Sequence, residues 1–281
     1  MTVDTAPMLT TLNASREDLE KMALSCRRNI VDMVYRAKAG HPGGSLSVID
    51  ILVALYGTQL RVSPDAGSHP DRDRLILSKG HASPAMYAVL ESRGFLTETD
   101  LESYRVFGGT CQGHVDMDWT NGVDFSAGSL GMGLSFGIGC AIAARMDESD
   151  RATWVILGDG ECQEGEVWEA AMAAQHHNLT KLHVIVDRNR IQNDDHIDRQ
   201  MRLGDLAAKW ESFGWSVLEI DGHDMGELTD ALHWCKEIDR PTAIIAHTVK
   251  GKGVSFMEDD PSFHGKAPND EEYILAMEEL S

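Results

Sequence analysis

The strongest constraint on the fold is a strand, a glycine turn, a helix and a second strand that follow one another directly. The apolar run Thr153–Leu157 leads into Gly158-Asp159-Gly160, a helix is predicted over Gly165–His177, and a second apolar run covers Leu182–Val186. Parallel strands need a crossover connection such as this helix, because a short hairpin can join only antiparallel strands. The segment therefore predicts a parallel sheet with a helix packed on one face.

The same alternation extends over most of the chain. We predict further strands at Arg74–Leu77, Ser216–Ile220 and Thr242–His247, a loop at Gly40–Ser45, and helices at Ser15–Ala39, Leu46–Leu60, Gly128–Met146, Leu206–Phe213, Met225–Lys236 and Asn269–Ser281, with another ending near Arg93. This pattern is typical of an α/β fold with a mostly parallel central sheet and helices on both faces. We expect a single domain over residues 1–281, with a helical N-terminal segment at about 15–60.

The chain carries a large excess of acidic residues, with 45 Asp and Glu against 25 Lys and Arg and a formal net charge of −20. Such a surface repels nucleic acid and anionic membranes, so we expect neither as a partner. Five cysteines, none of them in a CxxC pair, are typical of reduced thiols in a cytoplasmic protein. Residues 1–13 lack the features of a signal peptide, and no apolar run is long enough to span a bilayer.

Polar turns follow both strands of the first segment. Asp159 lies between two glycines after one strand, and Asn189 follows the next strand. Ligands of open α/β sheets bind at the carboxyl ends of the strands, where glycine lets the backbone approach a phosphate and a helix start offers free N–H groups. Carboxylate and amide oxygens suit Mg²⁺. The pattern favours a site for a metal and a diphosphate, although a glycine turn alone is more often a plain surface turn.

Four of the 12 histidines lie in glycine-containing loops: His41, His81, His114 and His264. Histidine in a loop can donate a hydrogen bond or move a proton near neutral pH. Taken singly, each is more simply a surface or loop-capping residue, and their spacing does not suit a metal cluster. The turn Lys250-Gly251-Lys252-Gly253 is either solvated or has a structural role near the site.

The turn GDG followed by Asn at this spacing resembles the thiamine diphosphate signature. In that family the aspartate, the asparagine and the carbonyl two residues later bind a divalent metal, which implies Asp159, Asn189 and Ile191 here. The metal is expected to be Mg²⁺, with Ca²⁺ or Mn²⁺ as alternatives. GDGECQEGEVWEAA is similar to the transketolase version in particular, and Glu164 matches a glutamate at the subunit contact near the cofactor.

The ordered motifs AGHPGG, SKGHA, GH, GSLGMG, GDG…N, KGKG and HGKAP resemble transketolase from about Arg27 to Pro268. The resemblance implies proton transfers on the donor sugar for His41 and His264, and contacts to substrate hydroxyls for His81 and His114. The cofactor would also touch a second set of residues: His81, Gly128, Ser129, Leu130, Asp159, Gly160, Glu164, Asn189 and His264.

Full transketolases carry two further domains, and the second holds the glutamate that activates the cofactor. This chain ends at Ser281, just beyond the last motif. The resemblance therefore implies the N-terminal subunit of a split transketolase that works with a separate C-terminal subunit in an α₂β₂ assembly. The implied reaction is transfer of a two-carbon ketol unit from a ketose to an aldose.

Two alternatives stay open: the α subunit of a 2-oxo acid decarboxylating enzyme, and a non-catalytic cofactor-binding partner. Deoxyxylulose-phosphate synthases resemble the chain less, because they lack the paired GHPGG and KGHA motifs. The sugar is not defined, and pentose phosphates, branched-sugar phosphates and sulfosugars are all compatible. The loop Phe107–Asp124 also departs from the family pattern, with Val115-Asp116 after the histidine in place of proline and glutamate.

Overall fold

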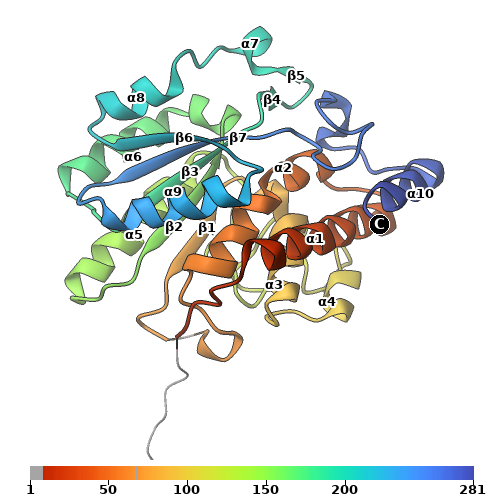
Figure 1. The fold of residues 1–281 in the computed structure, drawn as a ribbon, viewed down its shortest axis with the longest axis horizontal. Coiled ribbons are helices and arrows are strands. Elements are labelled where there is room, and N and C mark those ends of the chain that lie inside the picture. Colours follow the sequence, from red (N-terminus) through yellow and green to blue (C-terminus); the bar gives the residue numbers. More distant parts are fainter. Residues whose placement is uncertain (1–8, 68) are drawn as a thin grey trace, which may run out of the picture.

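Five parallel strands form the centre of the computed structural model, which describes residues 9–67 and 69–281. Their order across the sheet is β1-β2-β3-β7-β6 (Figure 1). The strands are β1 Arg74–Leu77, β2 Thr153–Gly158, β3 Leu182–Arg188, β6 Ser216–Asp221 and β7 Thr242–His247. Every neighbouring pair is parallel, which confirms the predicted sheet.

Helices cover both faces of the sheet (Figure 1). They are α1 Arg16–Ala37, α2 Pro42–Ala54, α3 Ser83–Ser92, α4 Glu98–Glu102, α5 Met132–Met146, α6 Gly165–His176, α7 Ile197–Gln200, α8 Leu206–Ser212, α9 Met225–Glu237 and α10 Asp270–Glu279. Within 9–67 and 69–281, no helix is both long and apolar enough to cross a bilayer. The prediction that residues 1–13 are not a signal peptide falls partly on residues 1–8, which lie outside the described residues.

Alternate residues of β2 explain the two-sided burial. Trp154 and Ile156 belong to the hydrophobic cluster formed with α1, α2, α3 and α9. Val155 and Leu157 belong to the cluster formed with α5, α6 and α8. Successive side chains of a strand point to opposite faces, so a strand that is covered on both faces is apolar throughout.

Two predicted helix boundaries were wrong. Helix α2 begins at Pro42, inside the predicted loop Gly40–Ser45, because proline at the first helical position is preorganised for the helix. At Gly43 the helix packs closely on the segment around Phe263, since an added Cβ would lie 2.9 Å from the carbonyl oxygen of that residue. Helix α5 begins at Met132 rather than Gly128, after Gly131 adopts a left-handed φ of +87°.

Short elements without long apolar runs were not predicted. They are the helices α4 and α7 and the antiparallel pair of β4 Ile191–Gln192 and β5 Asp195–His196. The β4–β5 hairpin directly follows β3, at the carboxyl edge of the sheet. The segments after β1, β2, β3 and β7 therefore meet at one edge, which is where ligands of such sheets bind.

Candidate functional site

A cavity of about 250 Å³ opens at this edge of the sheet. Most of the site residues predicted from sequence line it, namely His41, His81, His114, Gly128, Leu130, Asp159, Gly160, Asn189, Ile191 and His264. Ser129 and Glu164 do not line the cavity, and both are exposed to solvent. Glu164 lies beside the start of α5, because a Cβ added to Gly131 would be 2.8 Å from its own Cβ.

The four loop histidines come together in this cavity although they are far apart in sequence. The ring centroid of His41 lies 5.2 Å from that of His81, 6.0 Å from that of His114 and 5.3 Å from that of His264. The rings of His81 and His264 are 5.4 Å apart. A surface-histidine interpretation does not account for four imidazoles gathered around one cavity.

All four imidazoles are neutral at pH 7. Burial and nearby cationic groups lower the pKa of His41 to about 4 and that of His264 to about 3. Burial also lowers the pKa of His81 and of His114 below the usual value. A neutral imidazole keeps one donor and one acceptor nitrogen, so each ring can both give and take a hydrogen bond. Nδ1 of His41 is buried without a partner among the described residues, and is free for a ligand.

Asp159, Asn189 and Ile191 lie next to one another at the ends of β2 and β3. The carboxylate of Asp159 accepts hydrogen bonds from the backbone N–H of Gly160 at 2.8 Å and of Arg190 at 2.7 Å. The amide oxygen of Asn189 accepts the N–H of Ile191 at 3.2 Å. Burial and the charge of Asp187 raise the pKa of Asp159 to about 7, so a cation in the cavity would stabilise the ionised carboxylate.

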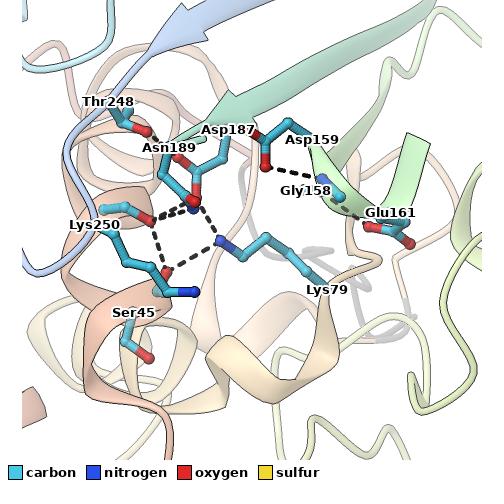
Figure 2. Close-up of polar contacts among 12 residues, drawn as sticks. Ser45, Lys79, Gly158, Asp159, Glu161, Asp187, Asn189, Thr248 and Lys250 are labelled. Carbon is cyan, nitrogen blue, oxygen red and sulfur yellow. Dashed lines mark hydrogen bonds and ion pairs between the residues drawn. The ribbon is translucent and has the colours of Figure 1, made fainter. Parts of the chain in front are cut away.

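A buried ion pair that was not predicted supports these residues from beneath (Figure 2). Lys79 is paired with Asp187, and both side chains are almost fully buried. The ammonium of Lys79 also donates to the carbonyl of Gly44 at 3.1 Å. Burial alone would raise the pKa of Asp187, but the charge of Lys79 and donated hydrogen bonds outweigh it and lower the pKa.

Lys250 also lines the cavity and is 2% exposed, so the solvated-turn interpretation of its motif was wrong for this residue. Its ammonium donates to the carbonyl of Ile191 at 3.2 Å and lies 2.8 Å from Nδ1 of His264. Because an ammonium can only donate, Nδ1 of His264 is the acceptor and the ring proton is on Nε2. Burial and the charge of Lys79 lower the pKa of Lys250 to about 8.

Glu161, inside the GDGE turn, joins three segments at the cavity wall. Its carboxylate accepts the N–H of Gly131 at 2.9 Å and that of Gly158 at 3.0 Å, and it also accepts the hydroxyl of Ser78. These bonds link the start of α5, the end of β2 and the segment after β1. Glu161 therefore fixes the relative positions of elements that carry predicted cofactor contacts.

The family model of the transketolase thiamine diphosphate-binding domain matches residues 19–280. The chain belongs to this family. The predicted resemblance is thereby confirmed, and the 2-oxo acid decarboxylase alternative is not supported.

Two curated relatives match over nearly their full length. The chain is 41% identical over 269 residues to an apulose-4-phosphate transketolase subunit from Phocaeicola vulgatus, covering 94% of each chain. It is 38% identical over 264 residues to the 6-deoxy-6-sulfo-D-fructose transketolase subunit SqwG of Clostridium sp. strain MSTE9, covering 94% of this chain and 96% of the relative.

A solved transketolase from Campylobacter jejuni has the same fold, with a TM-score of 0.90 and 32% sequence identity. The match covers 95% of this chain and 43% of the solved chain, so the chain spans less than half the length of that transketolase. The chain thus corresponds to the N-terminal, thiamine diphosphate-binding part of a transketolase-like enzyme.

The residues at the cavity fit the cofactor of this family. Within the described ranges, no group of three or more His, Cys, Asp or Glu side chains could hold a metal by itself. A carboxylate, an amide oxygen and a backbone carbonyl form an incomplete set that oxygens of a bound diphosphate would complete. Gly128 has nothing within 4 Å of an added Cβ, which leaves open space along the wall where a cofactor would lie.

The functional residues missed from sequence are Lys79, Glu161, Asp187 and Lys250. Lys79 and Lys250 stand inside motifs that were recognised, SKGHA and KGKG, and Glu161 follows the GDG turn directly. The usable signal for Asp187 was its place directly after the apolar run Leu182–Val186, where burial is expected. Gln192 also lines the cavity, and its Oε1 is buried without a partner among the described residues.

Proposed function

We propose that this chain is the cofactor-binding subunit of a two-subunit enzyme that transfers a two-carbon ketol unit from a ketose to an aldose. The observation that carries this proposal is the gathering of four neutral imidazoles around the cavity that also holds Asp159, Asn189 and Ile191. A carbon–carbon bond next to hydroxyl groups cannot be broken and remade without proton transfers to and from oxygen, which imidazoles perform.

Asp159, Asn189 and the carbonyl of Ile191 would hold a divalent cation, Mg²⁺ or alternatively Ca²⁺ or Mn²⁺, against the diphosphate. Gly160, Gly128, Ser129 and Leu130 would lie along the cofactor with their backbone groups. Thiamine diphosphate supplies, when bound, the carbon nucleophile and the electron sink that the reaction needs. The chain supplies binding, orientation and proton transfer.

The histidines would act on the sugar. His264 has its ring proton on Nε2, so it can donate to an oxygen of the donor sugar, and His41 can accept or return a proton through its unpartnered Nδ1. His81 and His114 would hold substrate hydroxyls, and His81 would also touch the cofactor. The neutral state of these rings suits hydrogen bonding and proton exchange at pH 7.

The partner would be a separate C-terminal subunit, in an α₂β₂ assembly that closes the cavity and meets Glu164. The names of two relatives support such a division, since both are described as subunits of a transketolase. Those names also favour an anionic ketose, with a phosphate or a sulfonate remote from the carbonyl, as donor. We further propose one domain over residues 1–281, with its helical segment at about 15–60, and a cytoplasmic location for the enzyme.

The test is reconstitution. The chain is assayed alone, and then with the product of its neighbouring gene as the candidate C-terminal subunit, using thiamine diphosphate, Mg²⁺ and ribose 5-phosphate as acceptor. Donors are xylulose 5-phosphate, apulose 4-phosphate and 6-deoxy-6-sulfofructose. Transfer only in the mixture supports the proposal and identifies the donor. Transfer by the chain alone contradicts the two-subunit division, and a stable complex without transfer from any donor contradicts the reaction.

A further inference from the structure

The carboxylate of Asp187 receives four side-chain donors, which compensate for the loss of water around this buried charge. It is 0% exposed. Its Oδ2 accepts from Ser47 Oγ at 2.6 Å, from Asn189 Nδ2 at 3.3 Å and from the ammonium of Lys79, and its Oδ1 accepts from Thr248 Oγ1. The donors come from α2 and from the segments after β1, β3 and β7, as Figure 2 shows for three of them.

This arrangement determines which way the amide of Asn189 points. A carboxylate paired with an ammonium only accepts hydrogen bonds, so the NH₂ group of Asn189 must face Asp187. The hydroxyl of Ser47 lies 3.3 Å from the same NH₂ group and donates its own proton to Asp187, so it too is an acceptor for Asn189. The amide oxygen of Asn189 is therefore turned away from Asp187, on the side where it accepts the N–H of Ile191 at 3.2 Å and where the residue lines the cavity.

We infer that Asp187, held by Lys79, is a positioning residue that locks the Asn189 amide with its oxygen toward the cation site. A flipped amide would present two N–H groups to a cation and repel it. Residues that orient metal ligands in this way commonly change metal affinity by roughly 10- to 100-fold when they are replaced. The inference rests on the proposed function, because it concerns the cation of the proposed cofactor.

A purely structural role for the ion pair predicts something different. Buried ion pairs can often be replaced by neutral residues with little loss of stability, provided that both charges are removed together. If Lys79 and Asp187 only joined α2 to β3, their joint replacement would change unfolding but not cation affinity in the folded protein. The two roles can therefore be separated by measuring cation binding and thermal stability on the same variants.

The experiment measures Mn²⁺ binding to the reconstituted two-subunit complex by electron paramagnetic resonance, with saturating thiamine diphosphate. The main variant is K79M/D187N, which removes one positive and one negative charge and so leaves the net charge beside the cavity unchanged. We expect its Mn²⁺ dissociation constant to rise by roughly 10- to 100-fold. The matched control is T248V, which removes a donor from the other oxygen of Asp187 and leaves the contact with Asn189. We expect its Mn²⁺ affinity to stay within about twofold.

A rescue step makes the test specific to orientation. Replacing Asn189 by Asp presents an oxygen whichever way the side chain is rotated. N189D should therefore improve Mn²⁺ binding in the K79M/D187N background and weaken it in the wild-type background, where the new carboxylate would face Asp187. Added negative charge alone would act in the same direction in both backgrounds, so the opposite signs identify the effect of orientation.

Should K79M/D187N fail to fold, S47A tests the same contact, because it removes the second acceptor of the Asn189 NH₂ group; a several-fold loss of affinity is expected. Unchanged Mn²⁺ affinity in a folded K79M/D187N, or in S47A, would overturn the inference. So would equal losses in K79M/D187N and T248V that follow their losses of thermal stability. If the wild-type complex binds neither Mn²⁺ nor thiamine diphosphate, the proposed function fails instead.

Discussion

His41 occupies the middle of the histidine cluster, within 6.0 Å of three other imidazole centroids. We predict that H41A lowers kcat/KM of the reconstituted enzyme by roughly 10²–10⁴-fold, the usual contribution of a positioned proton-transfer group. Its affinity for thiamine diphosphate should stay nearly unchanged, because the diphosphate contacts lie on other residues. Steady-state kinetics and calorimetric titration measure the two quantities.

His233 provides the matched control for this prediction. It lies exposed on α9, where its Nδ1 is hydrogen-bonded to the backbone oxygen of Thr229 four residues earlier. H233A should retain wild-type kinetics. Equal activity of H41A and H233A would contradict the proton-transfer role of His41.

A second histidine makes stability depend on pH without touching the site. His183 on β3 is 2% exposed, its ring centroid lies 4.4 Å from that of Trp154, and its Nδ1 is hydrogen-bonded to Thr242 Oγ1 at 2.8 Å. Burial lowers its pKa to about 3, and Lys236 and Lys181 contribute to the shift. Because the unfolded chain binds this proton near pH 6.5 and the folded chain does not, stability is lost as the pH falls from about 6.5 to about 3.

We predict that H183Q makes the free energy of unfolding less dependent on pH in the acid range. At pH 7 the wild type should be the more stable, because glutamine cannot reproduce the ring contact with Trp154. The difference in free energy of unfolding in favour of the wild type should shrink by on the order of 3–5 kcal/mol toward pH 3, since only the wild type must keep a buried imidazole neutral. Urea unfolding of both proteins at pH 7, 5 and 4 measures the difference. A stability difference that is constant with pH would contradict the prediction.

The limits of sequence reasoning are clear at the residue scale. His41, His81, His114 and His264 could be predicted because each stands in a recognisable glycine-containing motif. The partners of Asp187 could not, because Ser47, Lys79 and Thr248 are ordinary polar residues 140, 108 and 61 positions away in the chain. Only the folded sheet edge brings them together, and no local pattern encodes such contacts.

At the scale of elements, Gly133 sets how closely α5 approaches the segment after β1. A Cβ at this position would lie 2.4 Å from the Cβ of Ser78, and the N–H of Gly133 donates to Ser78 Oγ at 3.1 Å. We predict that G133A destabilises the chain by about 1–3 kcal/mol, because the helix must move outward. It should also weaken cofactor binding, since Glu161 bonds both Ser78 and Gly131.

Gly139 on the same helix is the control, because an added Cβ there meets nothing within 4 Å. Replacement of a helical glycine by alanine without a clash stabilises a protein by about 0.4–1 kcal/mol. G139A should therefore raise the thermal midpoint while G133A lowers it. Midpoints that move in the same direction would show that the close contact at Gly133 does not control α5.

The elements themselves were predictable wherever a long apolar run defines them. Strand β2 and helix α9 were found almost to the residue, because each has an apolar pattern bounded by polar or glycine residues. The start of α2 was missed because His41 provides no side-chain cap and two glycines follow Pro42. The β4–β5 hairpin was missed because two-residue strands have no periodicity to detect.

For the whole molecule, the sequence predicts the parallel sheet but not the strand order β1-β2-β3-β7-β6. The order decides which loops share the cavity, and it follows from how the helices pack rather than from any single motif.

Apolar side chains left in solvent are also a property of the whole molecule. Met132, Phe136 and Met146 on α5 are 46%, 37% and 79% exposed, on the helix that follows the cavity residue Leu130.

This exposed side of α5 is where we expect the partner protein to dock, because it continues from the cavity wall and would otherwise leave apolar surface in water. We predict that M132E/F136D weakens association with the C-terminal subunit by roughly tenfold or more, and that it lowers transfer activity in proportion when the subunits are dilute. Sedimentation velocity of the mixed subunits measures the association. I274D, on the exposed side of α10 and far from α5 in Figure 1, should leave association unchanged. A mixture that assembles equally well with both variants would place the partner on another face, and α5 would then need a different explanation for its exposed methionines.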